Sequence, residues 1–161
     1  NLGTIIRIAD WFGIEDIICS EETVEVYNPK VIQATMGSIS RVRVHYTDLV
    51  SFLEESKKEL PSLNVYGALL DGDNLFENPL TAEGYILIGN ESKGISPELI
   101  PFVTDKIRIP SFAVSDSGLK TGATPVSGIR PVSGAESLNA AIAASIICSE
   151  FRRRGIKQKQ K

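Results

Sequence analysis

Residues 85–96 decide the fold, and they read Tyr85-Ile86-Leu87-Ile88-Gly89-Asn90-Glu91-Ser92-Lys93-Gly94-Ile95-Ser96. An apolar run stops at a glycine, a polar Asn-Glu pair and a second glycine follow, and a short helix is predicted to open at Ser96-Pro97. A strand that runs into a tight loop and then a helix is where open α/β sheets bind ligands. The glycines permit close backbone approach and positive φ. A plain strand–turn–helix corner would have a similar sequence, so other segments must decide.

Apolar periodicity and turn residues predict alternating helices and strands on both sides of this loop. The predicted helices span 1–12, 28–36, 48–60, 97–102 and 137–153, and the predicted strands span 16–19, 42–45, 65–70, 85–88 and 106–109. Residues 71–74 are predicted to form a turn. This alternation predicts an α/β domain with a mostly parallel sheet and helices on both faces.

Two further segments carry polar residues at fixed spacing. The chain opens with Asn1-x-Gly3-x-x-x-Arg7, and Ile109-Pro110 is followed later by Ser137-Leu138-Asn139 and a helix of small residues. Together with Gly89-Asn90-Glu91-x-x-Gly94, and in this order, these segments resemble the three motifs of the SpoU/TrmH family of RNA 2′-O-ribose methyltransferases, which belongs to the SPOUT class. Residues 27–30 and 34–38 are similar to the family's segment between its first two motifs.

The resemblance implies a knotted (trefoil), SPOUT-like α/β fold, so that residues 1–161 form one catalytic domain. It implies S-adenosyl-L-methionine as cofactor and methyl transfer to a ribose 2′-hydroxyl of transfer or ribosomal RNA. It also implies a cytoplasmic homodimer in which Arg7 of one subunit completes the site of the other. Because family members usually carry residues ahead of the first motif, we expect this chain to lack an N-terminal region.

The resemblance also assigns the site. It implies catalytic roles for Asn1, Arg7, Glu91, Ser137 and Asn139, and cofactor contacts from Gly89, Ile109 and Leu138. Methyl transfer to a hydroxyl is an in-line displacement that needs alignment and proton removal, with no metal and no nucleophilic residue. A guanidinium is effectively always protonated, so we interpret Arg7 as a bidentate clamp on the neighbouring phosphate and not as a base.

Ordinary structural roles compete with each assignment. Asn1 could cap the first helix, Glu91 the helix after its loop, and Ser137 the closing helix, whereas Arg7 could be an exposed helix residue. In the functional interpretation Asn1 positions Arg7 or the substrate, and Glu91 orients Arg7 or Asn139. His45, the last residue of the predicted strand 42–45, is interpreted as structural.

The chain departs from the family between Ile109-Pro110 and Ser137-Leu138-Asn139. Residues 111–133 intervene where the family has few residues, and they are rich in Ser, Thr, Gly and Pro. We predict a disordered insertion here, with a substrate lid as the alternative.

Charge is unevenly distributed. The net charge is −3, but residues 150–161 hold six basic residues and one acid, so the rest of the chain carries −8. A generic polyanion binder is therefore disfavoured. An RNA enzyme with this charge must contact RNA through a few local basic residues, through a further domain, or through this tail. The tail is interpreted first as a solvated, frayed terminus.

The remaining composition sets limits on function. The chain is long enough for one domain, and none of its apolar runs approaches the ~20 residues of a membrane span. Cys19 and Cys148 match no metal or redox spacing and are predicted to be buried free thiols, and we expect no metal. A nicotinamide-dependent oxidoreductase is disfavoured because no Gly-x-Gly-x-x-Gly follows an early strand. A non-catalytic RNA-binding or assembly factor on the same fold remains the alternative function.

Overall fold

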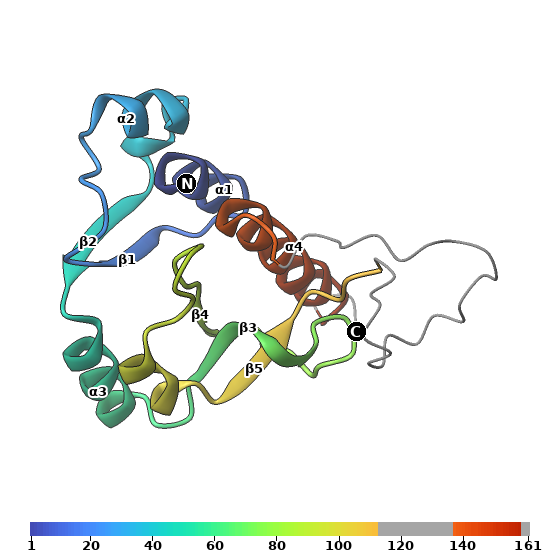
Figure 1. Ribbon diagram of the computed structural model, residues 1–161. Coiled ribbons are helices and arrows are strands. Elements are labelled where there is room, and N and C mark those ends of the chain that lie inside the picture. Colours follow the sequence, from blue (N-terminus) through green and yellow to red (C-terminus); the bar gives the residue numbers. More distant parts are fainter. Residues whose placement is uncertain (113–136, 159–161) are drawn as a thin grey trace, which may run out of the picture.

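The structure, a computed structural model, describes residues 1–112 and 137–158 (Figure 1). Each predicted helix and strand is found, with displaced ends in every case except 97–102, which is a 3₁₀ helix with the predicted bounds. In chain order the elements are α1 (Leu2–Trp11), β1 (Asp16–Ser20), α2 (Pro29–Thr35), the 3₁₀ helix η1 (Ser38–Ser40), β2 (Arg43–Thr47), α3 (Leu49–Glu59), β3 (Asn64–Asn74), β4 (Gly84–Leu87), the 3₁₀ helix η2 (Pro97–Phe102), β5 (Asp105–Arg108) and α4 (Ala140–Gln158). Apart from Ser111 and Phe112, the predicted insertion at 111–133 lies outside the described residues.

Local chemistry explains where the helices begin. The Asn28 side chain accepts a hydrogen bond from the backbone N–H of Lys30, and Pro29 occupies the first position of α2. The Asp48 carboxylate accepts from two backbone N–H groups in the first turn of α3. Both satisfy N–H groups that a helix start leaves without partners. The two helix starts were therefore readable from sequence.

The strands are parallel, as predicted, but their pairings form two sheets. β1 pairs with β2, and β3 lies between β4 and β5. Beyond these strands, Asn90 and Gly94 form an isolated antiparallel bridge inside the loop after β4.

The predicted turn at 71–74 is wrong, because β3 continues through it to Asn74. Ile107 of β5 pairs with both Ala68 and Asp73, so β3 bulges between these two positions and then resumes its pairing. Gly72 makes the return possible: a Cβ there would lie 2.7 Å from the backbone carbonyl carbon of Ile107. The turn residues are present, but the chain re-enters the sheet.

Side chains of the three-stranded sheet alternate between two hydrophobic clusters. Tyr66 and Ile107 pack with Ile147 of α4 on one face. Val65 packs with Leu53 of α3, and with Leu99 of η2, on the other face. This alternation has the two-residue period of a strand. Helices therefore cover both faces of this sheet, as predicted, and Figure 1 shows α3 and α4 on opposite sides of it.

The third hydrophobic cluster joins α1, α2, β1 and β2, with Ile6 fully buried at its centre. Gly3 is the point where α1 approaches α2 most closely. A Cβ on Gly3 would overlap the carbonyl oxygen of Val31 and lie 2.7 Å from Cβ of Ala34. The glycine of the first motif is thus required by helix packing.

α4 is fixed to the rest of the molecule by arginines near its C-terminal end. Arg152 donates to the carbonyl oxygens of Phe12 (2.5 Å) and Gly13 (2.8 Å) at the end of α1. Arg154 donates to backbone carbonyls of the segment after β3, at Leu75, Phe76 and Asn78. Residues 152–154 are therefore not a frayed terminus; this part of that interpretation is wrong.

We predict that Gly3→Ala destabilises the protein by roughly 1–2 kcal/mol, because overpacking against the Val31 backbone outweighs the higher helix propensity of alanine. Chemical denaturation with linear extrapolation measures the free energy of unfolding. Thr4→Ala, at the exposed neighbouring position, is the control and should be close to neutral. A more stable Gly3→Ala protein would contradict the close contact.

The surroundings of Glu150 predict that the folded state loses stability in acid. The Glu150 side chain is 5% exposed, and hydrogen bonds from Arg153, together with those from Arg154, lower its pKa from 4.5 to about 2. A carboxyl whose pKa is lower in the folded state stabilises that state above its unfolded pKa. This contribution, roughly 2–3 kcal/mol, should be lost as the pH falls from about 4.5 towards 2.

Unfolding free energies measured across this pH range test the point. Glu150→Gln should flatten the acid limb, whereas Glu54→Gln, at an exposed position on α3, should leave it as in the wild type. Parallel acid limbs for the wild type and Glu150→Gln would show that the pair contributes nothing.

Candidate active site

The loop after β4 has a fixed shape. A Cβ on Gly89 would overlap the backbone of Gly94 and Ile95, so this position must be glycine. Asn90 and Gly94 exchange backbone hydrogen bonds of 2.9 and 2.8 Å, and Gly94 has a φ of +69°. The Asn90 side chain accepts from the backbone N–H of Ser92. These constraints define the position of Glu91 at the loop's tip.

Asn139 joins the three sequence motifs. Its side-chain N–H groups donate to Oδ1 of Asn1 (2.8 Å) and to Oε1 of Glu91 (2.6 Å). Its own Oδ1 accepts from the backbone N–H groups of Ala141 (2.9 Å) and Ile142 (3.3 Å). Residues that lie 138 and 48 positions from Asn139 in the chain therefore meet at one amide.

An asparagine side chain offers two N–H donors and one oxygen with two lone pairs, and all four are used here. The amide orientation follows, because an exchange of its oxygen and nitrogen would set N–H against N–H at the helix. Asn1 retains its NH₂ group, and Glu91 its second carboxylate oxygen, without a partner among the described residues. The cluster can therefore still donate to, and accept from, a bound molecule.

Two of the competing structural roles are now decided. Asn1 occupies the N-cap position of α1 but makes no side-chain capping bond. The helix predicted from Ser137 begins instead at Ala140, and Asn139 caps it. Ser137 is exposed and makes no hydrogen bond to the described residues. The signal for this cap was present in sequence, since asparagine is among the preferred N-cap residues.

Arg7 is exposed on α1 and forms no hydrogen bond or ion pair within the part of the chain that the structure describes. It forms no hydrogen bond with Asn1 or Glu91, whose side-chain hydrogen bonds are to Asn139, so neither orients it within the described part of one chain. Spacing along the helix places it on the side of α1 that faces α2 and η1, between Gly3 and Asp10.

Asp10 and its partners were missed in the sequence. The Asp10 carboxylate accepts hydrogen bonds from the buried Ser38 hydroxyl (2.7 Å) and from the Arg41 guanidinium (2.7 Å). Both bonds lower the pKa of Asp10, and the bond from Arg41 has the larger effect. They fasten η1 to α1 one turn beyond Arg7. No local pattern marks them, because the partners are far apart in the chain. Burial raises the pKa of Cys148 to about 11, as expected for an unreactive buried thiol.

The proposed cofactor residues lie at the carboxyl edge of the strands. Gly89 follows β4, half-buried Ile109 follows β5, and Leu138, with 45% of its surface exposed, precedes Asn139. Since Glu91 contacts Asn139, Gly89 and Leu138 each lie within two residues of that contact. A purine requires apolar contacts, and the half-buried Ile109 and the exposed Leu138 are apolar side chains that could supply them.

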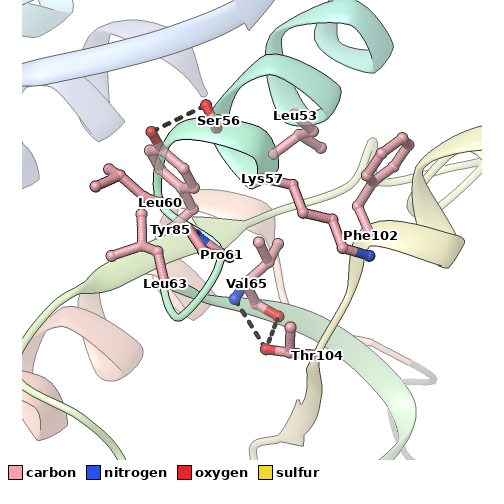
Figure 2. A pocket seen from close by; sticks show the side chains of 10 residues that line it. All are labelled: Leu53, Ser56, Lys57, Leu60, Pro61, Leu63, Val65, Tyr85, Phe102 and Thr104. Carbon is pink, nitrogen blue, oxygen red and sulfur yellow. Dashed lines mark hydrogen bonds between the residues drawn. The ribbon is translucent and has the colours of Figure 1, made fainter.

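A small cavity beside α3 is not part of this site. It has a volume of about 30 Å³, enough for a single water molecule. Figure 2 shows its lining, which includes Leu53 and Ser56 of α3, Tyr85 at the start of β4 and Val65 at the start of β3. It therefore opens at the amino ends of the strands, opposite the Asn1–Glu91–Asn139 cluster.

Comparison with known proteins gives the class of protein. Residues 1–117 match the sequence model of the SpoU rRNA Methylase family, and the chain belongs to that family. Among the described residues, no set of three or more His, Cys, Asp or Glu side chains is arranged to hold a metal ion. The helices of the described regions include none with the length and hydropathy of a membrane span.

Three relatives are similar over nearly all of this chain. The 23S rRNA (guanosine(2553)-2'-O)-methyltransferase RlmP of Bacillus subtilis is 29% identical over 94% of this chain and 53% of its own length. A TrmH-family RNA methyltransferase structure from Porphyromonas gingivalis is 39% identical, with coverages of 94% and 54% and a TM-score of 0.75. The AdoMet-bound rRNA methyltransferase structure from Sinorhizobium meliloti is 28% identical, with coverages of 95% and 51% and a TM-score of 0.74. The chain thus spans about half the length of these relatives.

We predict that the Asn139 amide is energetically coupled to Glu91. Asn139→Asp keeps an N-cap but sets a second carboxylate against Glu91, whereas Asn139→Ala loses the cap, which costs roughly 0.5–2 kcal/mol. Glu91→Gln should therefore restore stability to Asn139→Asp but not to Asn139→Ala. Thermal or denaturant unfolding of the single and double variants gives the coupling energy. Additive effects would mean that the 2.6 Å contact carries no energy.

Proposed function

We propose that this chain is the catalytic part of an enzyme that transfers a methyl group from S-adenosyl-L-methionine to a ribose 2′-hydroxyl of RNA. The observation that carries the proposal is the Asn139 amide, which brings residues of all three motifs into one hydrogen-bonded cluster. Membership of the SpoU family supports the reaction class. Ribosomal RNA is the first candidate substrate, because the Bacillus and Sinorhizobium relatives are named for it.

The cofactor would supply an electrophilic methyl group, and the chain would supply alignment. The unpartnered NH₂ of Asn1 and the second oxygen of Glu91 could donate to, and accept from, the substrate hydroxyl. Ser137, exposed two residues before Asn139, is free to add a further hydrogen bond. The adenosyl group would be held by Gly89, Ile109 and Leu138. The loops around these residues would form a trefoil knot.

Arg7 would act on the RNA side of the reaction. Its guanidinium stays protonated, so it would clamp the phosphate beside the target ribose with two hydrogen bonds and stabilise the developing alkoxide. Since Arg7 has no hydrogen-bond or ion-pair partner among residues 1–112 and 137–158, we propose that it completes the site of a second subunit in a homodimer. Exposed Trp11 on α1 (84%) and Ile142 on α4 (53%) support an interface through these two helices.

The test combines calorimetry with S-adenosylmethionine and transfer of labelled methyl groups to in vitro transcribed 23S rRNA. The wild type should bind the cofactor and methylate a ribose. Arg7→Ala should leave cofactor affinity unchanged and lower turnover by at least ~10²-fold, the scale of one lost electrostatic stabiliser. Arg7→Lys should rescue little, because an ammonium keeps the charge but loses the bidentate geometry.

RNA binding without cofactor binding would instead favour a non-catalytic RNA-binding factor. Near-normal turnover of Arg7→Lys would eliminate the bidentate clamp. Loss of cofactor binding in Arg7→Ala would remove Arg7 from the RNA side of the reaction. A monomer in light scattering at micromolar concentration would argue against a shared site.

A further inference from the structure

One surface of the molecule combines exposed apolar groups with a local absence of negative charge. The sequence contains no Asp or Glu between Glu25 and Asp48, although the whole chain has 20 acidic residues. This acid-free segment forms α2, η1 and β2. We call the exposed residues Tyr27, Lys30, Ile32 and Met36 the α2 surface.

Apolar side chains of the α2 surface lie along one line. Tyr27 precedes the N-cap of α2 and Ile32 is the fourth residue of the helix, and residues at these two positions approach each other across a helix start. Met36 lies four residues after Ile32, on the same side of the helix. Tyr27 and Met36 are 73% and 71% exposed, and Ile32 is 42% exposed. The ring and the thioether are therefore open to solvent on a firmly capped helix.

The α2 surface adjoins Arg7. Gly3 of α1 contacts Val31 and Ala34 of α2, and Asp10 contacts Ser38 and Arg41. Arg7 lies between Gly3 and Asp10 on the same side of α1, so it lies beside the segment between Ala34 and Ser38. Met36, with a left-handed φ of 50°, is in that segment. Spacing along α1 therefore places Arg7 on the side of the molecule that carries Met36.

The electrostatics of this surface favour a polyanion. Arg41 and Ser38 already satisfy the carboxylate of Asp10, which faces the segment from α1. Lys30 is exposed and its ammonium has no hydrogen bond or ion pair among the described residues, and the same holds for Arg7. Glu25 remains at the edge, two residues before Tyr27. A surface that binds single-stranded nucleic acid typically offers cations to the phosphates and aromatic rings on which bases stack. Arg7 and Lys30 are such cations, and Tyr27 is such a ring.

We propose that the α2 surface binds the RNA strand next to the nucleotide that enters the catalytic site, with bases on Tyr27 and Met36 and a phosphate at Lys30. The inference rests on the proposed function, because the position of Arg7 beside the target ribose orients the strand. A second protein chain is the competing occupant. It is disfavoured because Arg7 and Lys30 lack ion pairs among the described residues, and unpaired cations at the edges of a small apolar stripe suit a phosphate backbone better than a dry protein interface. Lys30 is two residues from Ile32 and therefore lies on another side of α2.

The test measures RNA affinity separately from methyl transfer, by fluorescence anisotropy with fragments of in vitro transcribed 23S rRNA. Tyr27→Ala should weaken binding about 5- to 100-fold, the range for loss of a base stacked on an aromatic ring. Met36→Ala removes an apolar contact and should weaken binding by less than Tyr27→Ala. Lys30→Ala should also reduce the dependence of log Kd on log salt by about 0.7, the value for one single-strand phosphate. Cofactor affinity and Tm should not change, because the three side chains are exposed.

Matched controls come from the same chain. Leu70→Ala removes an apolar side chain that is 70% exposed on β3, and Lys58→Ala removes an exposed lysine on α3. Both should bind RNA like the wild type.

The two proposals fail in different ways. Variants of the α2 surface that bind RNA like their controls would overturn the surface, whatever the wild type's activity. RNA binding that depends on Tyr27 without any methyl transfer would retain the surface and overturn the enzyme. A change in sedimentation instead of RNA affinity would assign the surface to a protein partner and overturn the proposal, and so would absence of RNA binding by the wild type.

Discussion

The side-chain amide of Asn139 is the constraint on which the site depends. Its oxygen fixes the start of α4, and its two N–H groups hold the start of α1 and the loop after β4. Because every donor and acceptor of the amide is used, the three segments meet in one orientation only. The same helix pair is fastened again at its far end, where Arg152 donates to the carbonyls that terminate α1. Two helices held at both ends keep Asn1 in place more rigidly than one contact could.

Close backbone approach is what makes this arrangement possible, and glycine provides it twice. At Gly3, α1 lies so near α2 that a methyl group would overlap a carbonyl oxygen, and at Gly89 the loop folds back on its own backbone. Gly3 has no proposed contact with a bound molecule, and the contact proposed for Gly89 is with the adenosyl group. Their positions within the motifs follow from packing: the first sets the distance between α1 and α2, and the second sets the height of Glu91 above the sheet. A catalytic motif can therefore consist largely of residues that shape the backbone around a few polar groups.

Much of the fold could be predicted from sequence because its signals are local. Asn28 and Asp48 cap the helices that follow them, and apolar alternation marks the strands. The predictions that failed concern contacts between residues far apart in the chain. The turn residues at 71–74 gave no sign that Ile107 would pair on both sides of a bulge. Within the site, the functional interpretation left open whether Glu91 orients Arg7 or Asn139, and the contact is with Asn139. The Asp10–Ser38–Arg41 cluster and the carbonyl contacts of Arg152 were not predicted, because their partners are far apart in the chain and follow no spacing rule.

The charge distribution reconciles an acidic chain with the proposed RNA substrate. At physiological ionic strength a surface charge acts over about 8 Å, so the net charge of −3 matters less to a bound phosphate than the groups within a few residues of it. Some of the carboxylates in the described residues are held in ion pairs, among them Asp10 with Arg41, Asp16 with Arg43 and Glu150 with Arg153. Arg7 and Lys30 have no such partner among the described residues, and both adjoin the segment between Glu25 and Asp48 that contains no acid. The acidic remainder would then repel RNA from every other approach, so that local cations and global charge together would select one face of the molecule for the strand.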